Sequence, residues 1–169
     1  MRLKLRQVIS GFVYNEEGKA IVFDSTKFDL ASRILIDLEQ NVLIMYQLRE
    51  ELRQFLESKK LKAKLLKKKE DIETWNTGSQ RFMAGHPLSM GHGLNLQDGG
   101  NNIFWYSLPR SAEQYMQVNY RLRRTGQELP VVLHRILFKN TIDEVIVSEQ
   151  REKAETQEGF ERAIKSYRG

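Results

Sequence analysis

The chain has 169 residues, a formal net charge of +5 and an isoelectric point of about 9.4, and 40% of its residues are hydrophobic. This length suits one domain with a complete core, and the composition is ordinary for a soluble globular protein. Cysteine is absent, which excludes disulfides and thiolate metal sites, and no apolar run approaches the roughly 18 residues of a membrane span. No signal peptide is recognisable. We therefore expect a single cytoplasmic domain, residues 1–169, without a membrane partner.

The positive charge is uneven along the chain. The segment KKLKAKLLKKK, residues 59–69, contains seven lysines, whereas the C-terminal segment EQREKAETQEGFERAIK mixes both signs. A lysine run is either a solvated face or a patch that contacts the phosphate backbone of a nucleic acid. The sequence leaves both interpretations open.

The first part of the chain alternates between strand-like and helix-like patterns. RQVISGFVY (6–14) is apolar and β-branched, which is typical of strands, and NEEG (15–18) is typical of a turn. AIVFD follows this turn. Apolar residues at helical spacing predict a helix over about 27–39. NVLIMYQ (41–47) is a short apolar run of the kind that is buried on both faces of a parallel sheet.

The middle of the chain continues this alternation. A helix over about 48–58 comes first, followed by LKAKLL (61–66), a candidate strand with outward-facing lysines. EDIETWNTG (70–78) predicts a short helix ended by its glycine. QRFMAGH (80–86) and NNIFWYS (101–107) are further candidate strands.

The last third of the chain contains two predicted helices and one strand. The first helix runs from Ser111 to Thr125, with Ser111 as its N-cap and Gly126 at its end. PVVLHRILF (130–138) is a strand, and residues 141–167 form a long amphipathic helix interrupted near Gly159. This alternation predicts an α/β fold, a three-layer α/β/α domain with a mainly parallel central sheet and a C-terminal helix.

Two common catalytic arrangements are missing from the sequence. A phosphate-binding P-loop needs G-x-x-x-x-G-K-[ST], but the nearest approach, GFVYNEEGKA, has six residues between its glycines and Ala20 in place of the hydroxyl. No acidic run suits magnesium, so this chain alone lacks the parts that bind and activate a nucleoside triphosphate. His86, His92 and His134 lack metal-ligand spacing, and we predict no metal site.

Two segments combine into a candidate anion site. HPLSMGHGLNLQDGG (86–100) follows a candidate strand, and its glycines allow backbone amides to approach a ligand closely. In QVNYRLRRTGQ (117–127), Gln117, Arg121 and Arg124 fall on one face of a helix. We expect both segments at the carboxyl ends of parallel strands, where α/β sheets bind ligands. Because arginine suits phosphate, the pattern favours an anion clamp.

The chain also resembles a known family over nearly its whole length. The order LRQ…G, NVLIMYQ, W-N-x-G, GHGLNLQ, SAEQYMQVNYRLRRTGQ and LFKNTIDE is similar to the C-terminal RecA-like lobe of Swi/Snf-type superfamily-two helicases. The likeness is greatest to compact versions from bacteriophages and their bacterial hosts. NVLIMYQ resembles motif IV, G-x-G-L-N-L resembles motif V, and Q-x-x-x-R-x-x-R-x-G-Q resembles motif VI. A phage-encoded protein of this kind would act in the bacterial cytoplasm.

The resemblance implies a role for each residue of the last motif, which in that family faces ATP held by the other lobe. Arg124 would be the arginine finger on the γ-phosphate, Arg121 a second phosphate or interlobe contact, and Gln117 a sensor that orients them. An arginine finger contributes about 10³ to 10⁵ in turnover. Glu113 and Gln127 would buttress the motif.

The same resemblance implies the remaining contacts. Gly91, Gly93 and Asn95 would line the interlobe cleft and couple the nucleotide state to DNA. Many relatives carry Ser-Thr-x-Ala-Gly-Gly ahead of motif V, whereas this chain reads HPLSMG, with a single hydroxyl. The residues expected to contact nucleic acid are Gln47, Ser89, Lys67 and Lys68.

The resemblance finally implies a partner, because the first RecA-like lobe with its P-loop is absent from these residues. We expect that lobe in the same protein or in a separate chain. The complete two-lobe enzyme would use ATP and Mg²⁺ and move on double-stranded DNA, whereas this chain alone would bind no cofactor tightly and show no ATPase activity. The alternative is a stand-alone RecA-like module that binds nucleic acid or protein without catalysis.

Overall fold

The computed structural model describes residues 2–167 apart from 91–93, with side chains described from residue 3 to residue 156 outside that gap. Its centre is a five-stranded sheet in the order β4-β5-β3-β6-β7, in which all neighbouring strands are parallel. The strands are β3 (Val42–Met45), β4 (Lys64–Leu65), β5 (Phe82–Gly85), β6 (Asn102–Trp105) and β7 (Val132–Arg135). The central strand β3 is fully buried, as its continuous apolar run predicted.

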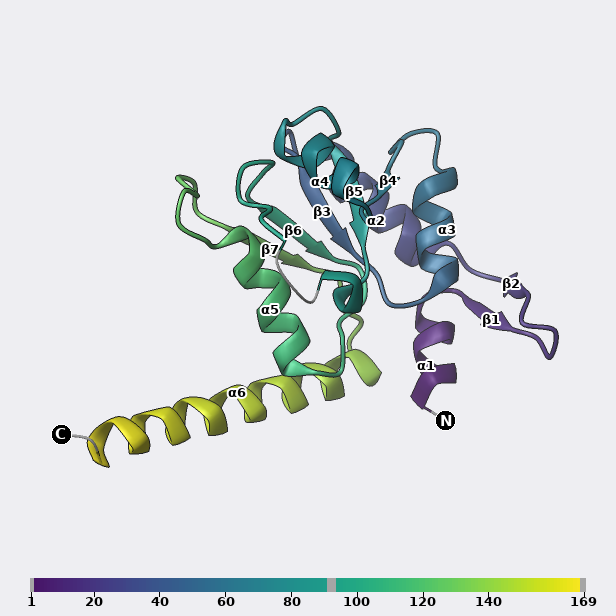
Figure 1. Ribbon diagram of the computed structural model, residues 1–169. Coiled ribbons are helices and arrows are strands. Elements are labelled where there is room, and N and C mark those ends of the chain that lie inside the picture. Colours follow the sequence, from purple (N-terminus) through teal and green to yellow (C-terminus); the bar gives the residue numbers. More distant parts are fainter. Residues whose placement is uncertain (1, 91–93, 168–169) are drawn as a thin grey trace.

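Helices cover both faces of this sheet (Figure 1). One face carries α2 (Thr26–Asp37) and α3 (Arg49–Glu57), and the other carries α4 (Lys69–Asn76), α5 (Ala112–Leu122) and the start of α6 (Ile142–Tyr167). A short 3₁₀ helix, η1 (Pro87–Met90), follows β5. The predicted three-layer α/β/α domain with a parallel sheet and a C-terminal helix is therefore confirmed.

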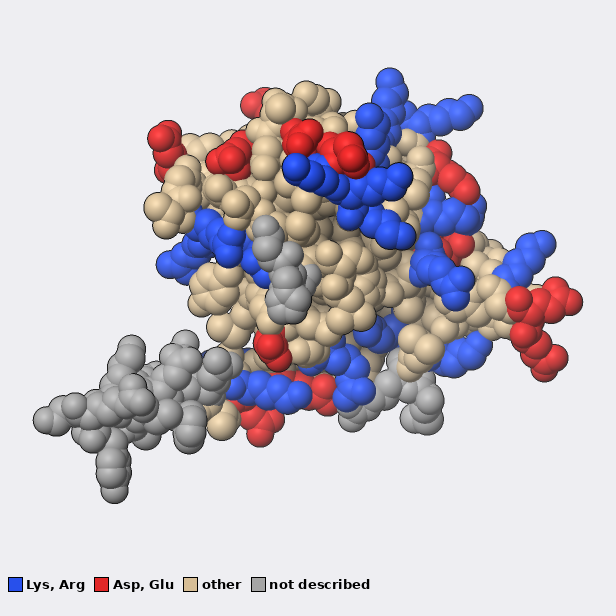
Figure 2. All heavy atoms as spheres, viewed as in Figure 1, with Lys and Arg blue, Asp and Glu red and all other residues tan. Residues whose placement is uncertain are grey.

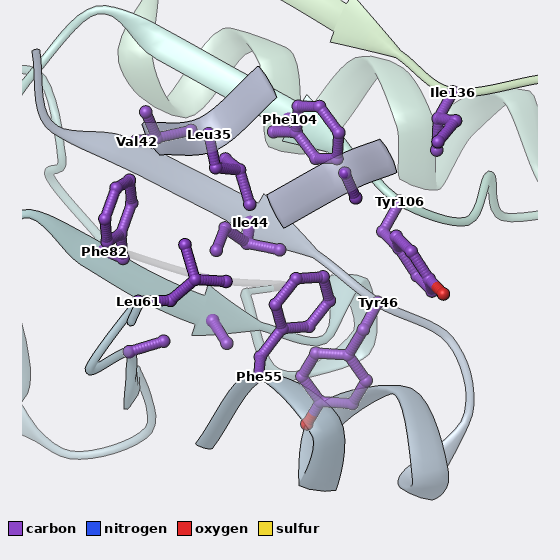
Figure 3. Close-up of a cluster of buried hydrophobic side chains, with 13 residues drawn as sticks. Leu35, Val42, Ile44, Tyr46, Phe55, Leu61, Phe82, Phe104, Tyr106 and Ile136 are labelled. Carbon is purple, nitrogen blue, oxygen red and sulfur yellow. The ribbon is translucent and has the colours of Figure 1, made fainter. Parts of the chain in front are cut away.

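The two cores follow from the alternation of side chains along the strands. Val42 and Ile44 of β3 point towards α2 and α3, where they pack with Leu35 and Phe55 (Figure 3). The intervening residues of β3 point the other way, into a second core that contains Trp75 of α4 and Val118 and Leu122 of α5. Both layers are thus fixed by buried side chains of the same strand.

The strand-like interpretation of the first residues was wrong. Arg2–Ile9 forms a helix, α1, and only Phe12–Tyr14 (β1) is a strand, paired antiparallel with Ala20–Val22 (β2) in a separate hairpin. Long-range contacts explain the difference, because Arg6 near the end of this helix donates to the carbonyl of Leu108, and Ser10 just after it donates to Glu51. Local β-propensity gives way to these tertiary contacts.

The prediction that the last helix is interrupted near Gly159 is also wrong. The backbone of α6 is helical from Ile142 to Tyr167, through Gly159, and α6 extends away from the sheet (Figure 1). A single glycine inside a helix costs only about 1 kcal/mol relative to alanine, and most of its neighbours here are good helix formers.

Candidate functional site

Helix α5 carries the first part of the predicted anion clamp. Its N-cap is Ser111, as expected, because the Ser111 hydroxyl accepts a hydrogen bond from the backbone N–H of Gln114 at 3.2 Å. On the outer side, Gln117 Nε2 donates to Glu113 Oε1 at 2.9 Å. Arg121 is half-buried in the last turn. Gln117 and Arg121 therefore lie on α5 as predicted, with Glu113 supporting Gln117.

Arg124 does not lie on this helix, contrary to the sequence prediction. The helix ends at Leu122, Arg123 leaves the helical conformation, and Gly126 has a φ of +101° that favours glycine. The side chain of Arg124 is exposed, and its Nη1 donates a hydrogen bond to Asn95 Oδ1. The guanidinium is thus presented by a turn and held by the neighbouring loop.

The turn after α5 docks against the segment that leads into β6. Gln127 Nε2 donates to the backbone carbonyls of Gln97 and Gly100, at 2.8 and 3.1 Å. Because the same segment accepts both Arg124 and Gln127, the glycine-rich loop and the arginine segment meet, as predicted. Gln127 supports the turn in the way the resemblance implied.

The glycine-rich loop and the arginine segment meet at the amino ends of the strands, so the prediction that they lie at the carboxyl ends is wrong. The segment that receives Arg124 enters β6 at its amino end, and Val132 of β7 donates its N–H to the carbonyl of Asn101 beside it, at 2.8 Å. The length of α5 explains this. Eleven residues rise about 16 Å, which carries the chain back across the sheet to the amino edge.

Helix α4 also contacts the segment that leads into β6. The indole Nε1 of Trp75 donates to the carbonyl of Leu96 at 2.8 Å, and Asn76 Nδ2 donates to the carbonyl of Asn95 at 2.9 Å. Asn41, just before β3, donates to the carbonyl of Gly99 at 2.7 Å. Trp75 and Asn76 belong to the W-N-x-G pattern, but the sequence assigned them no role.

The predicted nucleic-acid contacts lie away from Arg124, towards the carboxyl ends of the strands. Gln47 lies two residues beyond this end of β3, and its Nε2 is buried without a hydrogen-bond partner among the described residues. Ser89 lies exposed in η1, beyond the carboxyl end of β5. Lys67 and Lys68 follow β4, whose Leu65 pairs with Ala84 near that end of β5.

The lysine run forms an exposed patch along the β4 edge of the sheet. All seven lysines are exposed, and Figure 2 shows Lys and Arg side chains gathered over β4, the preceding loop and the start of α4. The patch consists of Lys59, Lys60, Lys62, Lys64, Lys67, Lys68 and Lys69.

The carboxylate of Asp71 fixes the backbone near the C-terminal end of the lysine patch. Asp71 Oδ2 accepts the N–H groups of Lys67 and Lys68 at 3.0 and 2.6 Å. The hydrogen bond from Lys68 is the main reason that the pKa of Asp71 lies below its ordinary value. Asp71 binds the backbone N–H groups of these two lysines, and their side chains remain exposed.

Arg124 has the chemistry expected of a phosphate contact. Its guanidinium donates to a neutral amide oxygen, and within the described part of the chain it forms no ion pair. It lines an open hollow of about 430 Å³. A guanidinium whose charge is not neutralised by a carboxylate suits an incoming phosphate.

Two of the predicted contacts cannot be placed in the structure. Gly91 and Gly93 lie outside the described residues. Among the side chains that the structure describes, no group of three or more histidine, aspartate or glutamate residues is arranged to hold a metal ion. In the same part of the chain, no helix is long and apolar enough to cross a membrane.

Comparison with known proteins identifies two relatives by sequence. The putative protein p41 of Acyrthosiphon pisum secondary endosymbiont phage 1 is 31% identical over 170 residues, which cover 96% of this chain and 37% of that protein. The chromatin-remodeling ATPase INO80 of Schizosaccharomyces pombe is 30% identical over 152 residues, 80% of this chain and 9% of that protein. The chain thus spans well under half of either relative. No family model matches it.

A solved structure shares the fold. The C-terminal part of the Fun30 ATPase domain superposes with a TM-score of 0.64 at 20% sequence identity, covering 73% of this chain and 44% of that one. At this identity the likeness concerns the fold alone.

Proposed function

Because the chain is a C-terminal RecA-like lobe of the Swi/Snf ATPase type, we propose that it is the second motor lobe of a DNA-dependent ATPase. In this proposal residues 1–169 form one helicase C-terminal domain. It works against a P-loop lobe carried by the same protein or by another chain. ATP is the substrate and is held, with Mg²⁺, by that other lobe.

The observation that carries the proposal is the presentation of Arg124. Its guanidinium is exposed, lines an open hollow and, within the described residues, donates to the neutral side chain of Asn95. Closure of the two lobes would bring this group to the γ-phosphate, where a positive charge stabilises the transition state of phosphoryl transfer. Arg121 and Gln117, one and two turns earlier on α5, would support the same contact.

The proposed DNA surface is separate from this arginine. Gln47, Ser89, Lys67 and Lys68 lie towards the carboxyl ends of β3, β5 and β4, whereas Arg124 lies at the amino edge of β6. Duplex DNA would contact the first surface and ATP the second. Asn95 would couple nucleotide state to movement on DNA, together with Gly91 and Gly93, which lie outside the described residues.

The test is DNA-stimulated ATP hydrolysis by this chain combined with a P-loop lobe. Arg124→Ala is expected to lower turnover by about 10³-fold or more while nucleotide binding to the other lobe persists. Arg33→Ala is the control, because Arg33 is an exposed arginine on α2 that does not line this hollow, and turnover should stay near the parent value. Near-normal turnover in Arg124→Ala would overturn the finger assignment.

A second function is favoured by the lysine patch alone. Seven exposed lysines along one sheet edge suit binding to a polyanion without any catalysis. A stand-alone nucleic-acid-binding module would bind duplex DNA equally well with and without a P-loop lobe. It would show no ATP hydrolysis in the mixture.

A further inference from the structure

Helix α4 touches both proposed surfaces of the lobe. Lys67 and Lys68 stand immediately before its first turn, and Asn76 is its last residue. Eight residues rise about 12 Å, so α4 spans the distance between the two edges of the short parallel strands. A rigid helix of this kind moves as one body when either end is displaced.

The amino end of α4 is tied to the lysines by Asp71. Its carboxylate accepts the N–H groups of both Lys67 and Lys68. A displacement of these two residues by a bound phosphate backbone is therefore passed to the first turn of the helix through two charge-assisted hydrogen bonds.

The carboxyl end of α4 is tied to Arg124 through one intermediate residue. Asn76 Nδ2 donates to the backbone carbonyl of Asn95, and the side chain of Asn95 accepts the hydrogen bond from Arg124. Trp75 makes the contact rigid, because its indole is fully buried and bonds to the carbonyl of Leu96. A Cβ atom on Gly99 would lie 2.3–2.4 Å from Trp75, so the segment is packed directly against this residue.

We infer that Asn76 is a positioning residue for Arg124, and that α4 carries DNA contact at Lys67 and Lys68 to the arginine through Asn76 and Asn95. This inference rests on the proposed function, which supplies both the DNA contact and the role of Arg124. It adds a physical route between them that is independent of Gln117 and Arg121. Displacement of α4 changes the hydrogen bond that holds the guanidinium at rest.

The test uses the ¹⁵N-labelled chain and the NMR signal of the Arg124 Nε–Hε group, assigned by its loss in Arg124→Lys. A short DNA duplex is expected to shift this signal in the parent chain and in Thr77→Ala, a control at the residue that follows α4. Asn76→Asp keeps the shape but removes the donor, so duplex affinity should persist while the shift is lost. Should Asn76→Asp fail to fold, Asn95→Ala breaks the same connection from the other side.

The outcomes separate this inference from the proposed function. A duplex that binds without moving the Arg124 signal in the parent, or that moves it equally in Asn76→Asp, overturns the route through α4 and leaves the second-lobe assignment intact. A duplex that does not bind removes the DNA contact from the proposed function, and the inferred route falls with it.

Discussion

The hydroxyl of Ser107 lies 2.6 Å from Oε1 of Glu51, at the carboxyl end of β6, although the two residues are 56 positions apart. The same oxygen accepts the hydroxyl of Ser10 at 2.7 Å, and Oε2 accepts the backbone N–H groups of Gln47 and Leu48 at 2.9 and 3.0 Å. Glu51 is fully buried. One carboxylate therefore joins the segment after α1, the start of α3 and the end of β6.

Replacement of Glu51 by alanine should destabilise the fold strongly. Four donors lose their acceptor in a buried site, and we expect the free energy of unfolding to fall by about 3 kcal/mol. Urea denaturation followed by circular dichroism measures this change. Glu57→Ala on the same helix is the control, because its exposed pair with Arg53 should contribute under about 1 kcal/mol. Equal effects of the two substitutions would contradict the role assigned to Glu51.

His86 should make the fold less stable in mild acid. Burial lowers the pKa of His86 below its ordinary value of 6.5, although a backbone hydrogen bond to Gln47 opposes the shift. Its Nδ1 accepts the N–H of Leu88 at 3.2 Å, which requires an unprotonated nitrogen. Because the folded pKa is depressed, the unfolded chain takes up the proton first as pH falls below about 6.5, and stability is lost.

The measurement for His86 is an NMR titration of its ring signals, combined with unfolding at pH 7 and in mild acid. We expect a titration midpoint below 6.5 in the folded chain. In His86→Gln, the loss of stability on acidification should be smaller than in the parent. A midpoint at or above the ordinary value would show that the ring is not held in its neutral form.

The sequence was informative where local pattern and fold agree. β3 is an apolar run and β6 is largely apolar, and both are fully buried strands in a chain that alternates strands with helices. The same reasoning failed for α1, because contacts made by Arg6 and Ser10 to distant segments decide its conformation. Local patterning contains no information about such partners.

The candidate site could be predicted in composition but not in position. The pairing of the glycine-rich loop with the arginine segment was expected, and Arg124 contacts Asn95. The predicted position at the carboxyl ends of the strands was wrong. Which edge of the sheet the arginine segment reaches depends on the length of α5. Asn76 gave no chemical signal at all, since an amide that donates to a backbone carbonyl looks like any surface asparagine until the fold is known.

Gly99 should tolerate no side chain. A Cβ atom there would lie 2.3 Å from the carbonyl oxygen of Trp75 and 2.4 Å from its indole, both of which are buried and fixed. Gly99→Ala is expected to cost about 2–3 kcal/mol and to alter the fluorescence of Trp75 as the indole leaves Leu96. Gly18→Ala is the control, because no atom lies within 4 Å and its positive φ should cost about 1 kcal/mol. An equal cost at both glycines would show that the segment before β6 yields easily.

Lys67 and Lys68 should contribute to duplex affinity through charge alone. Each phosphate contact releases counterions, so the logarithm of the binding constant falls with the logarithm of salt concentration by about 0.9 per contact. Replacement of both lysines by glutamine should therefore weaken binding at low salt and reduce that slope by nearly two, whatever the DNA sequence. Fluorescence anisotropy of a labelled duplex over a salt series measures both quantities.

The control for this pair is Lys19→Gln combined with Lys139→Gln, which removes the same charge from exposed positions outside the patch. Loss of net charge alone would lower affinity equally in both double variants. A lower slope only in the Lys67 and Lys68 variant would assign the contact to the start of α4, where Asp71 holds the backbone of both lysines. Equal slopes would instead mean that DNA is attracted by the overall charge of the lobe, and that α4 has no direct part in binding it.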